Sequence, residues 1–284
     1  MGSVAADSSE EQPFTVLITG FGPFKRDYPV NPSWEIVHSL PTHLPPLRAK
    51  APHHHYPSSS SSSSSPPQQN QQQPAIPPVR LLVHPSPIRV NYQTVRALVP
   101  QLWDLDGGAA RTRIDAAIHV GMAGPRLFYS IERRGHRDGY GMPDVDGELL
   151  GDEDGEGGGE GDDKNKDKEG GGEGKKRFWK GLPAELETAL DVEDVLGRWR
   201  GHSPKHMDLR ISEDAGHYLC DFIYFSSLAH LEKAGEQRKV LFLHVPSDAS
   251  EHSIATGRDL LLQLVRSVVE SEMAKREGKA EAAS

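Results

Sequence analysis

Short apolar runs alternate with segments of helical periodicity along this chain, and that alternation limits its fold more than any other feature. The runs are rich in Val, Ile and Leu and end at glycine, proline or polar residues, as buried strands do. We expect strands at 15–19, 79–83, 114–120, 127–131, 208–212 and 239–243. We expect helices at 31–40, 91–103, 183–199, 218–228 and 253–273. Strands that alternate with helices are typical of an α/β domain: a mostly parallel, twisted open sheet with helices on both faces, in a three-layer αβα arrangement.

Two stretches of low complexity interrupt this pattern. Residues 51–78 hold three adjacent histidines, a serine run and a glutamine-rich run, and residues 151–176 are mostly glycine, acidic residues and lysine. Neither composition buries enough apolar surface to offset the entropy of ordering, and we interpret the histidines at 53–55 as solvated rather than as a weak metal site. We therefore expect one domain over 1–284. Its ordered core is expected at 14–50, 79–150 and 177–275, with disordered inserts at 51–78 and 151–176 and polar tails at 1–13 and 276–284.

Charge and hydropathy argue against several classes of protein. The formal net charge of -9 argues against a nucleic-acid-binding protein, because binding phosphates requires a basic face. No apolar run approaches the roughly 20 residues that span a bilayer. Residues 1–14 lack the charged and apolar regions of a secretory signal, so we expect neither membrane association nor secretion. A single cysteine forms no internal disulfide, which favours a reducing compartment, the cytoplasm.

The only cysteine, Cys220, lies in the stretch 212–222, where helical periodicity begins. Ser212 or Asp214 is the expected N-terminal cap of this helix. A thiol in the first turns of a helix lies near the positive end of the backbone dipole, which favours the thiolate that attacks carbonyls. The alternative is a small, inert core residue, as most single cysteines are.

A carboxylate and an imidazole follow two of the predicted strands. Glu132 comes directly after the strand at 127–131, and His244 follows the strand at 239–243. Because the carboxyl ends of parallel strands and the helix starts after them share one edge of a sheet, we expect both side chains near Cys220. A nucleophile, a base and an orienting group together indicate a cysteine hydrolase. The alternatives are a surface ion-pair cluster for Glu132, which has basic neighbours, and a structural role for His244.

The first predicted strand leads into a glycine-rich loop at 20–24 (GFGPF). A dinucleotide-binding loop is not indicated, because Lys25 stands at the third glycine of GxGxxG and Pro23 interrupts the loop. Phe21 and Phe24, at the end of a strand, instead indicate an apolar wall beside a ligand site, with core packing as the alternative.

Several motifs occur in the order in which one enzyme family carries them. The segments 16–24 (VLITGFGPF), 30–34 (VNPSW), 119–124 (HVGMAG), 130–133 (SIER) and 242–246 (FLHVP) resemble pyroglutamyl peptidase I, a family of cysteine peptidases. The segments 91–95 (NYQTV), 135–140 (GHRDGY) and 212–222 (SEDAGHYLCDF) are similar to its eukaryotic branch in particular. Together these segments occur across nearly all of the chain outside the tails and the two inserts.

The resemblance implies a mechanism with named roles. Cys220 is the implied nucleophile, His244 the general base and then the general acid, and Glu132 the residue that orients the imidazole. The implied activity is an omega-peptidase: hydrolysis of the amide bond after an N-terminal pyroglutamyl residue of small peptides, through a thioester acyl-enzyme. The resemblance implies no metal and no cofactor.

The resemblance also implies a substrate pocket, with two departures from the family pattern. Phe21 and Phe24 fall at positions that line the pocket for the lactam ring, and Tyr218 and Leu219 fall at neighbouring pocket positions. Bacterial members carry glutamine at the position of Met122, and the segment 139–144 lacks an arginine that those members have. These departures keep two alternatives open: a related cysteine amidase for another small N-blocked or cyclic amide, and a ligand-binding relative without catalysis.

Overall fold

The computed structural model describes residues 12–24, 28–47, 76–103, 113–124, 126–151 and 179–283. Most of the two predicted inserts and of the N-terminal tail lies outside these ranges. The elements in chain order are β1 (Phe14–Gly20), α1 (Pro32–Val37), β2 (Val79–Val83), α2 (Tyr92–Trp103), β3 (Ala116–Met122), β4 (Tyr129–Glu132), β5 (Arg134–His136), β6 (Glu185–Glu187), α3 (Val192–His202), β7 (Leu209–Ser212), α4 (Leu219–Lys233), β8 (Val240–Val245) and α5 (Glu251–Ala283).

The main sheet has the strand order β2-β1-β3-β8-β4-β7. Strands β2, β1, β3 and β8 are parallel to one another. Strand β4 pairs antiparallel with β8 and parallel with β7, so β4 and β7 run against the rest of the sheet. The mostly parallel α/β sheet expected from the sequence is confirmed, and the reversal of its last two strands is new. A separate two-stranded sheet joins β5 and β6.

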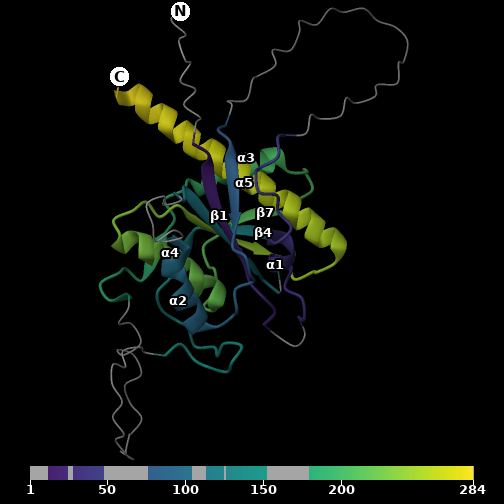
Figure 1. Cartoon of the computed structure of the whole chain (residues 1–284), viewed down its shortest axis with the longest axis vertical. Helices are drawn as coiled ribbons and strands as arrows, with labels where there is room; N and C mark the ends of the chain where they lie inside the picture. The colour runs from purple at the N-terminus through teal and green to yellow at the C-terminus, as the bar shows by residue number, and fades with distance from the viewer. Residues whose placement is uncertain are drawn as a thin grey trace, which may run out of the picture.

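Helices cover both faces of the sheet, as expected for a three-layer αβα fold (Figure 1). Helices α1 and α3 contact α5 on one face, and α2 and α4 pack together on the other. Strand residues alternate between the two cores because successive side chains point to opposite faces. Ile131 and Leu243 lie in the α1/α3/α5 core, and Leu17 and Phe242 lie in the α2/α4 core.

The same alternation decides which polar side chains face α4. Because Ile131 and Leu243 point toward the opposite core, Ser130, Glu132 and His244 point toward α4. Ser130 and Glu132 are 0 % exposed and His244 is 4 % exposed. The sheet therefore presents three buried polar groups to the layer that carries Cys220.

The helix predicted at 183–199 is wrong in its first half. Strand β6 occupies part of that range, and α3 begins only at Val192. The Asp191 carboxylate accepts a hydrogen bond from the backbone N–H of Asp194 at 3.0 Å and caps the helix. Leu186 and Leu190 have helical spacing, but Leu186 packs in the α2/α4 core and Leu190 in the opposite core. Tertiary packing therefore places Leu186 and Leu190 in different cores, although their spacing predicts one helix.

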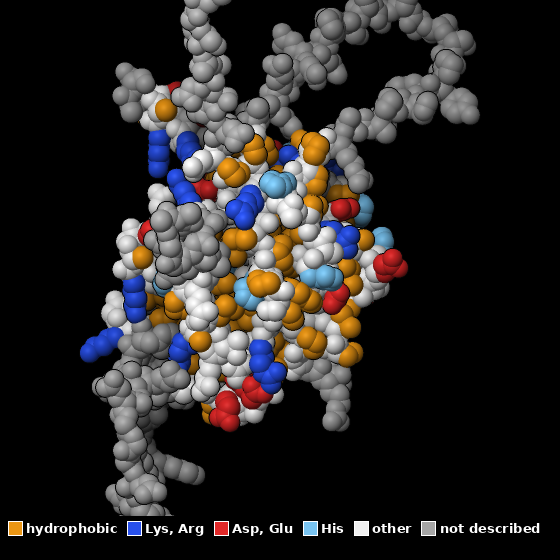
Figure 2. Space-filling model, viewed as in Figure 1, with side chains coloured by type: hydrophobic (Ala, Val, Ile, Leu, Met, Phe, Trp, Pro, Cys, Tyr) orange, Lys and Arg blue, Asp and Glu red, His pale blue; other side chains and the backbone are white. Residues whose placement is uncertain are grey.

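Helix α5 continues past the predicted end at Met273 to Ala283. The added residues are mostly Ala, Glu, Lys and Arg, which have high helix propensity, and their side chains are largely exposed. Within the described ranges, none of the helices is both long and apolar enough to cross a bilayer. On the face shown in Figure 2, the described Lys and Arg side chains are scattered among acidic and uncharged ones.

Candidate active site

Cys220 is the second residue of α4, a helix whose side chains are buried on nearly every side. Phe222, Tyr224 and Phe225 are all 0 % exposed. Cys220, taken as a whole residue, is only partly buried. The position near a helix start agrees with the sequence prediction. Helix α4 is buried on nearly every side because it lies between the main sheet, α2 and the β5–β6 sheet.

The N-terminal cap of α4 is neither Ser212 nor Asp214, the two residues expected from the sequence. The N-cap residue is Tyr218, and its side chain makes no capping hydrogen bond. Ser212 and Asp214 shape the preceding turn instead: the Ser212 hydroxyl donates to the carbonyl of Asp214 at 3.2 Å, and the Asp214 carboxylate accepts from Gly216 N at 2.8 Å. The first backbone N–H groups of a helix have no partner within it, and this type of position can bind an anionic group.

Glu132 and His244 are hydrogen-bonded to each other. Nδ1 of His244 lies 2.7 Å from Oε1 of Glu132. The antiparallel register pairs Ser130 with His244 and Glu132 with Phe242, so Glu132 and His244 are diagonal neighbours on one face. We expected both residues at one edge of a parallel sheet, but their contact depends on the reversed direction of β4.

Gly121 allows the Cys220 thiol to lie close to the strand that carries His244. Strands β3 and β8 pair Gly121 with His244. A Cβ at Gly121 would lie 2.8 Å from Sγ of Cys220 and 2.5 Å from Cζ of Phe242. The thiol thus lies against the backbone beside His244, although among the described residues no hydrogen bond joins Cys220 to His244. The structure brings all three predicted catalytic residues to one face of the sheet.

Arg126 is a member of this site that the sequence argument missed. Its Nη1 donates to Oε1 of Glu132 at 2.6 Å and to the Ser130 hydroxyl at 2.7 Å. The Glu132 pKa is lowered overall: burial raises it, and the hydrogen bond and charge of His244, with Ser212 and the Arg126 charge, outweigh burial. Glu132 is therefore an anion that holds the His244 imidazole. Arg126 stands three residues before β4 in a loop, and only its nearness to Glu132 in the chain could have indicated it.

The surroundings of Cys220 raise the pKa of its thiol, which opposes the helix-start effect expected from the sequence. Burial, followed by the charges of Glu132 and Asp221, raises its pKa to about 12, although the charge of Arg126 lowers it. Desolvation and two carboxylates thus outweigh the helix start. A thiol in this state reacts only when a base removes its proton during attack.

The other histidine on this face is not a candidate base. His119 is fully buried between two hydroxyls, with Nδ1 2.8 Å from Thr19 Oγ1 and Nε2 2.8 Å from Ser227 Oγ. Burial lowers its pKa to about 3, so it remains neutral at ordinary pH. His119 links β1, β3 and α4, and His244 is the imidazole of the site that contacts Glu132.

The four predicted pocket residues fall into two groups. Phe21 is 2 % exposed and Leu219 is 1 % exposed, so both pack in the α2/α4 core. Phe24 and Tyr218 are partly exposed, and their ring centroids lie 6.4 Å apart. Tyr218 also contacts Tyr92 edge to face at 6.2 Å. Of the four predicted pocket residues, Phe24 and Tyr218 are therefore the two whose side chains remain accessible to a ligand.

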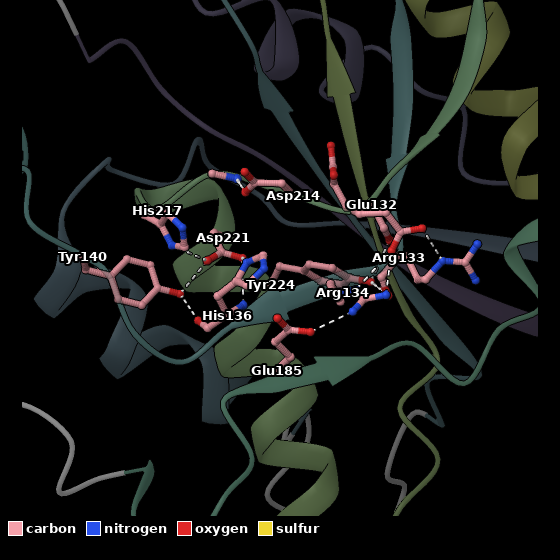
Figure 3. Close-up of polar contacts among 12 residues, drawn as sticks. Glu132, Arg133, Arg134, His136, Tyr140, Glu185, Asp214, His217, Asp221 and Tyr224 are labelled. Atoms are coloured by element: carbon pink, nitrogen blue, oxygen red, sulfur yellow. Dashed lines mark hydrogen bonds and ion pairs between the residues drawn. The ribbon is translucent and has the colours of Figure 1, made fainter.

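Figure 3 shows that the polar residues at and after the end of β4 lie in two groups. Arg133 and Arg134 form exposed ion pairs with Glu193, Glu213 and Glu185, so the surface-cluster alternative describes them but not buried Glu132. The second group is centred on Asp221, in the first turn of α4, and contains His136, Tyr140 and His217.

A cysteine at a helix start, an imidazole and a buried carboxylate bonded to that imidazole define a site of the cysteine-hydrolase class. No protein-family model matches the chain. Its sequence is similar to pyroglutamyl-peptidase 1 of Rattus norvegicus and of Homo sapiens, each 26% identical over 261 residues that cover 92% of this chain and 90% of the relative. Pyrrolidone-carboxylate peptidase of Thermococcus kodakarensis is 24% identical over 90% of this chain and 92% of its own length.

Solved structures agree on the fold. A mutant pyrrolidone carboxyl peptidase from Pyrococcus furiosus matches with a TM-score of 0.57 at 19% identity, covering 92% of this chain and 99% of that chain. The resemblance to pyroglutamyl peptidase I that the motifs indicated is therefore confirmed over nearly the whole chain, and the fold is that of pyrrolidone carboxyl peptidase.

Proposed function

We propose that this chain is a cysteine exopeptidase that removes an N-terminal pyroglutamyl residue from small peptides. The observation that carries the proposal is the buried Glu132–His244 hydrogen bond beside Cys220, at 2.7 Å. The named relatives are pyroglutamyl-peptidase 1 and pyrrolidone-carboxylate peptidase, whose matches cover 92% and 90% of this chain. The single cysteine supports a reducing compartment, the cytosol, as the place of action.

In the acylation step, His244 acts as the base. Because Glu132 holds Nδ1, the Nε2 nitrogen is the one that accepts the Cys220 proton. The sulfur forms a bond to the pyroglutamyl carbonyl carbon, and the carbonyl oxygen becomes an oxyanion. The unpaired N–H groups at the start of α4 are positioned to stabilise that charge. Collapse of the intermediate breaks the C–N bond, and the imidazolium gives its proton to the leaving amine.

In the deacylation step, water replaces the amine. His244 removes a proton from water, whose oxygen attacks the thioester carbonyl, and the thiol leaves with the proton that the imidazole returns. Glu132 stabilises the imidazolium in both steps because its low pKa keeps it ionised. The raised pKa of Cys220 makes the base essential, since little thiolate exists before the substrate binds.

The lactam ring is uncharged and flat, and an aromatic slot suits it. Tyr218 is the N-cap residue of α4, and its partly exposed ring lies beside that of Phe24. A peptide with a free amino terminus would place a charge against these rings without a partner, which costs several kcal/mol. The side chain of Met122, buried at 7 % exposure, lacks the amide of the bacterial glutamine, and this keeps open the alternative of a related cysteine amidase for another small blocked amide.

The test is release of a fluorophore from matched amides: pyroglutamyl, prolyl, N-acetylalanyl and pipecolyl derivatives of one fluorogenic amine. The proposal expects the pyroglutamyl amide to be cleaved fastest and prolyl amide least, with Cys220→Ser and His244→Ala inactive. Faster cleavage of another blocked amide would support the amidase alternative. Activity that survives Cys220→Ser would overturn the nucleophile, and no cleavage of any amide by folded wild type would overturn the enzyme.

A further inference from the structure

The group around Asp221 is a second cluster of metal-ligating side chains that the proposed peptidase mechanism does not use. His136, His217 and Asp221 each offer one ligand atom, and these atoms all lie within 4.8 Å of one another. Nδ1 of His136 is 3.3 Å from Oδ1 of Asp221, and Nδ1 of His217 is 3.9 Å from Oδ2. Ligand atoms around a tetrahedral zinc ion are about 3.3 Å apart, because each lies about 2.0 Å from the metal.

We propose that His136, His217 and Asp221 form a zinc-binding site with one coordination position left to water. Two imidazoles and one carboxylate are ligands that zinc accepts, and three protein ligands leave the fourth position of a tetrahedron open. The residues come from β5, the residue before the α4 cap and the first turn of α4, so the fold and not a local motif brings them together.

The carboxylate is held as a metal ligand requires. Asp221 is 0 % exposed, and Oδ1 accepts a hydrogen bond from the backbone N–H of His136 at 3.0 Å. Oδ2 accepts from the Tyr140 hydroxyl at 3.0 Å, and that hydroxyl also contacts the carbonyl of His136. Outer groups that orient a ligating carboxylate in this way are a regular part of metal sites.

The His217 imidazole packs against the backbone of Gly139 and is otherwise partly exposed to solvent. A Cβ at Gly139 would lie 2.8 Å from Nδ1 of His217, and Gly139 has a φ of +96° that other residues rarely adopt. Gly139 thus lets the His217 ring lie directly on the backbone, 5.1 Å from the His136 ring. The His217 side chain is 47% exposed, against 16% for His136, which gives an ion a path to the buried carboxylate.

The test measures metal binding and needs no peptidase activity, so its result is independent of the proposed function. The full chain carries Cys220→Ser and alanine at positions 53–55, which removes the thiol and the histidine triplet as competing ligands. Zinc chloride is titrated by calorimetry, and cobalt(II) by visible absorption, whose intensity reports tetrahedral coordination. We expect one zinc ion per chain. His217→Ala should weaken zinc binding by about 100-fold or more, because even changes to groups that only orient a ligand cost about 10–100-fold in metal affinity.

His252→Ala is the matched control, because His252 is also an exposed histidine and lies on α5, away from the cluster. It is expected to bind zinc as the parent does. Asp221→Asn, checked by circular dichroism, is expected to lose the tetrahedral cobalt spectrum. No binding by the parent, or binding unchanged in His217→Ala, would overturn the proposal and leave the cluster as a hydrogen-bonded ion pair of His136 and Asp221.

Discussion

Gly121 and the thiol of Cys220 are in such close contact that no side chain fits between them: a Cβ at Gly121 would lie 2.8 Å from Sγ. The same Cβ would lie 2.5 Å from the buried ring of Phe242. Gly121 is the register partner of His244, so this contact sets the position of the nucleophile relative to the base. The site therefore requires a residue without a side chain at position 121.

Gly121→Ala is therefore expected to move Cys220 and to lower kcat/KM by about 100-fold or more, because displacements near 1 Å have effects of that size. Overpacking should also lower the free energy of unfolding by about 1–3 kcal/mol. Gly141→Ala is the control, since a Cβ at that exposed glycine meets nothing within 4 Å. Kinetics and urea unfolding of both variants measure the difference. Equal kcat/KM in both would show that the thiol position tolerates the change.

Glu132→Gln should have opposite effects on two properties of the site. The loss of the orienting carboxylate is expected to lower kcat on the order of 10³–10⁴-fold. The Glu132 charge raises the Cys220 pKa, so its removal should lower that pKa and speed alkylation by iodoacetamide at pH 8. A resting thiolate–imidazolium pair predicts the reverse: slower alkylation, because the imidazolium loses its support. Exposed Glu236→Gln serves as the control.

Arg126→Met should shift the acid limb of the pH–rate profile upward. Arg126 lowers the Glu132 pKa, so without it the carboxylate takes up a proton at higher pH. Because the folded-state pKa of Glu132 is lowered, its contribution to stability is present above the unfolded pKa and is lost as pH falls through the folded one. In the variant that loss begins at higher pH. The lost charged hydrogen bonds should cost about 1.5–3 kcal/mol at neutral pH.

Two further variants complete that comparison. Arg126→Lys keeps the charge, so its acid limb is expected between those of wild type and Arg126→Met. Arg210→Met removes an arginine whose side chain is 52% exposed and paired with Asp208, and it should leave the limb in place. An unmoved limb in Arg126→Met would mean that Glu132 does not control the profile.

Phe24 and Phe21 should respond differently to truncation. Phe24→Ala is expected to raise KM for a pyroglutamyl amide by about tenfold, the effect of losing one apolar contact in a pocket. Phe21→Ala removes a ring that is 2 % exposed and should lower the free energy of unfolding by about 3–5 kcal/mol. Steady-state kinetics and denaturant titration of both variants decide between a pocket and a core role. A KM increase confined to Phe21→Ala would reverse the assignment.

Local pattern determined which elements form and which residues carry the chemistry. Apolar β-branched runs specify buried strands, and their alternation specifies which side chains share a face. For this reason the sequence alone placed Cys220 at a helix start and His244 on a buried strand. Where one pattern fits two structures, as between Leu186 and Leu190, packing against separate cores decided the outcome.

Tertiary structure alone decided how these residues meet. The direction of β4 depends on contacts between strands far apart in the chain, and no local pattern encodes it. That direction makes Glu132 a diagonal neighbour of His244 and brings Arg126 to the carboxylate. Burial and charge, which exist only in the folded chain, raise the Cys220 pKa against the helix-start effect. The sequence thus determined the reacting groups, and long-range packing determined their geometry and protonation.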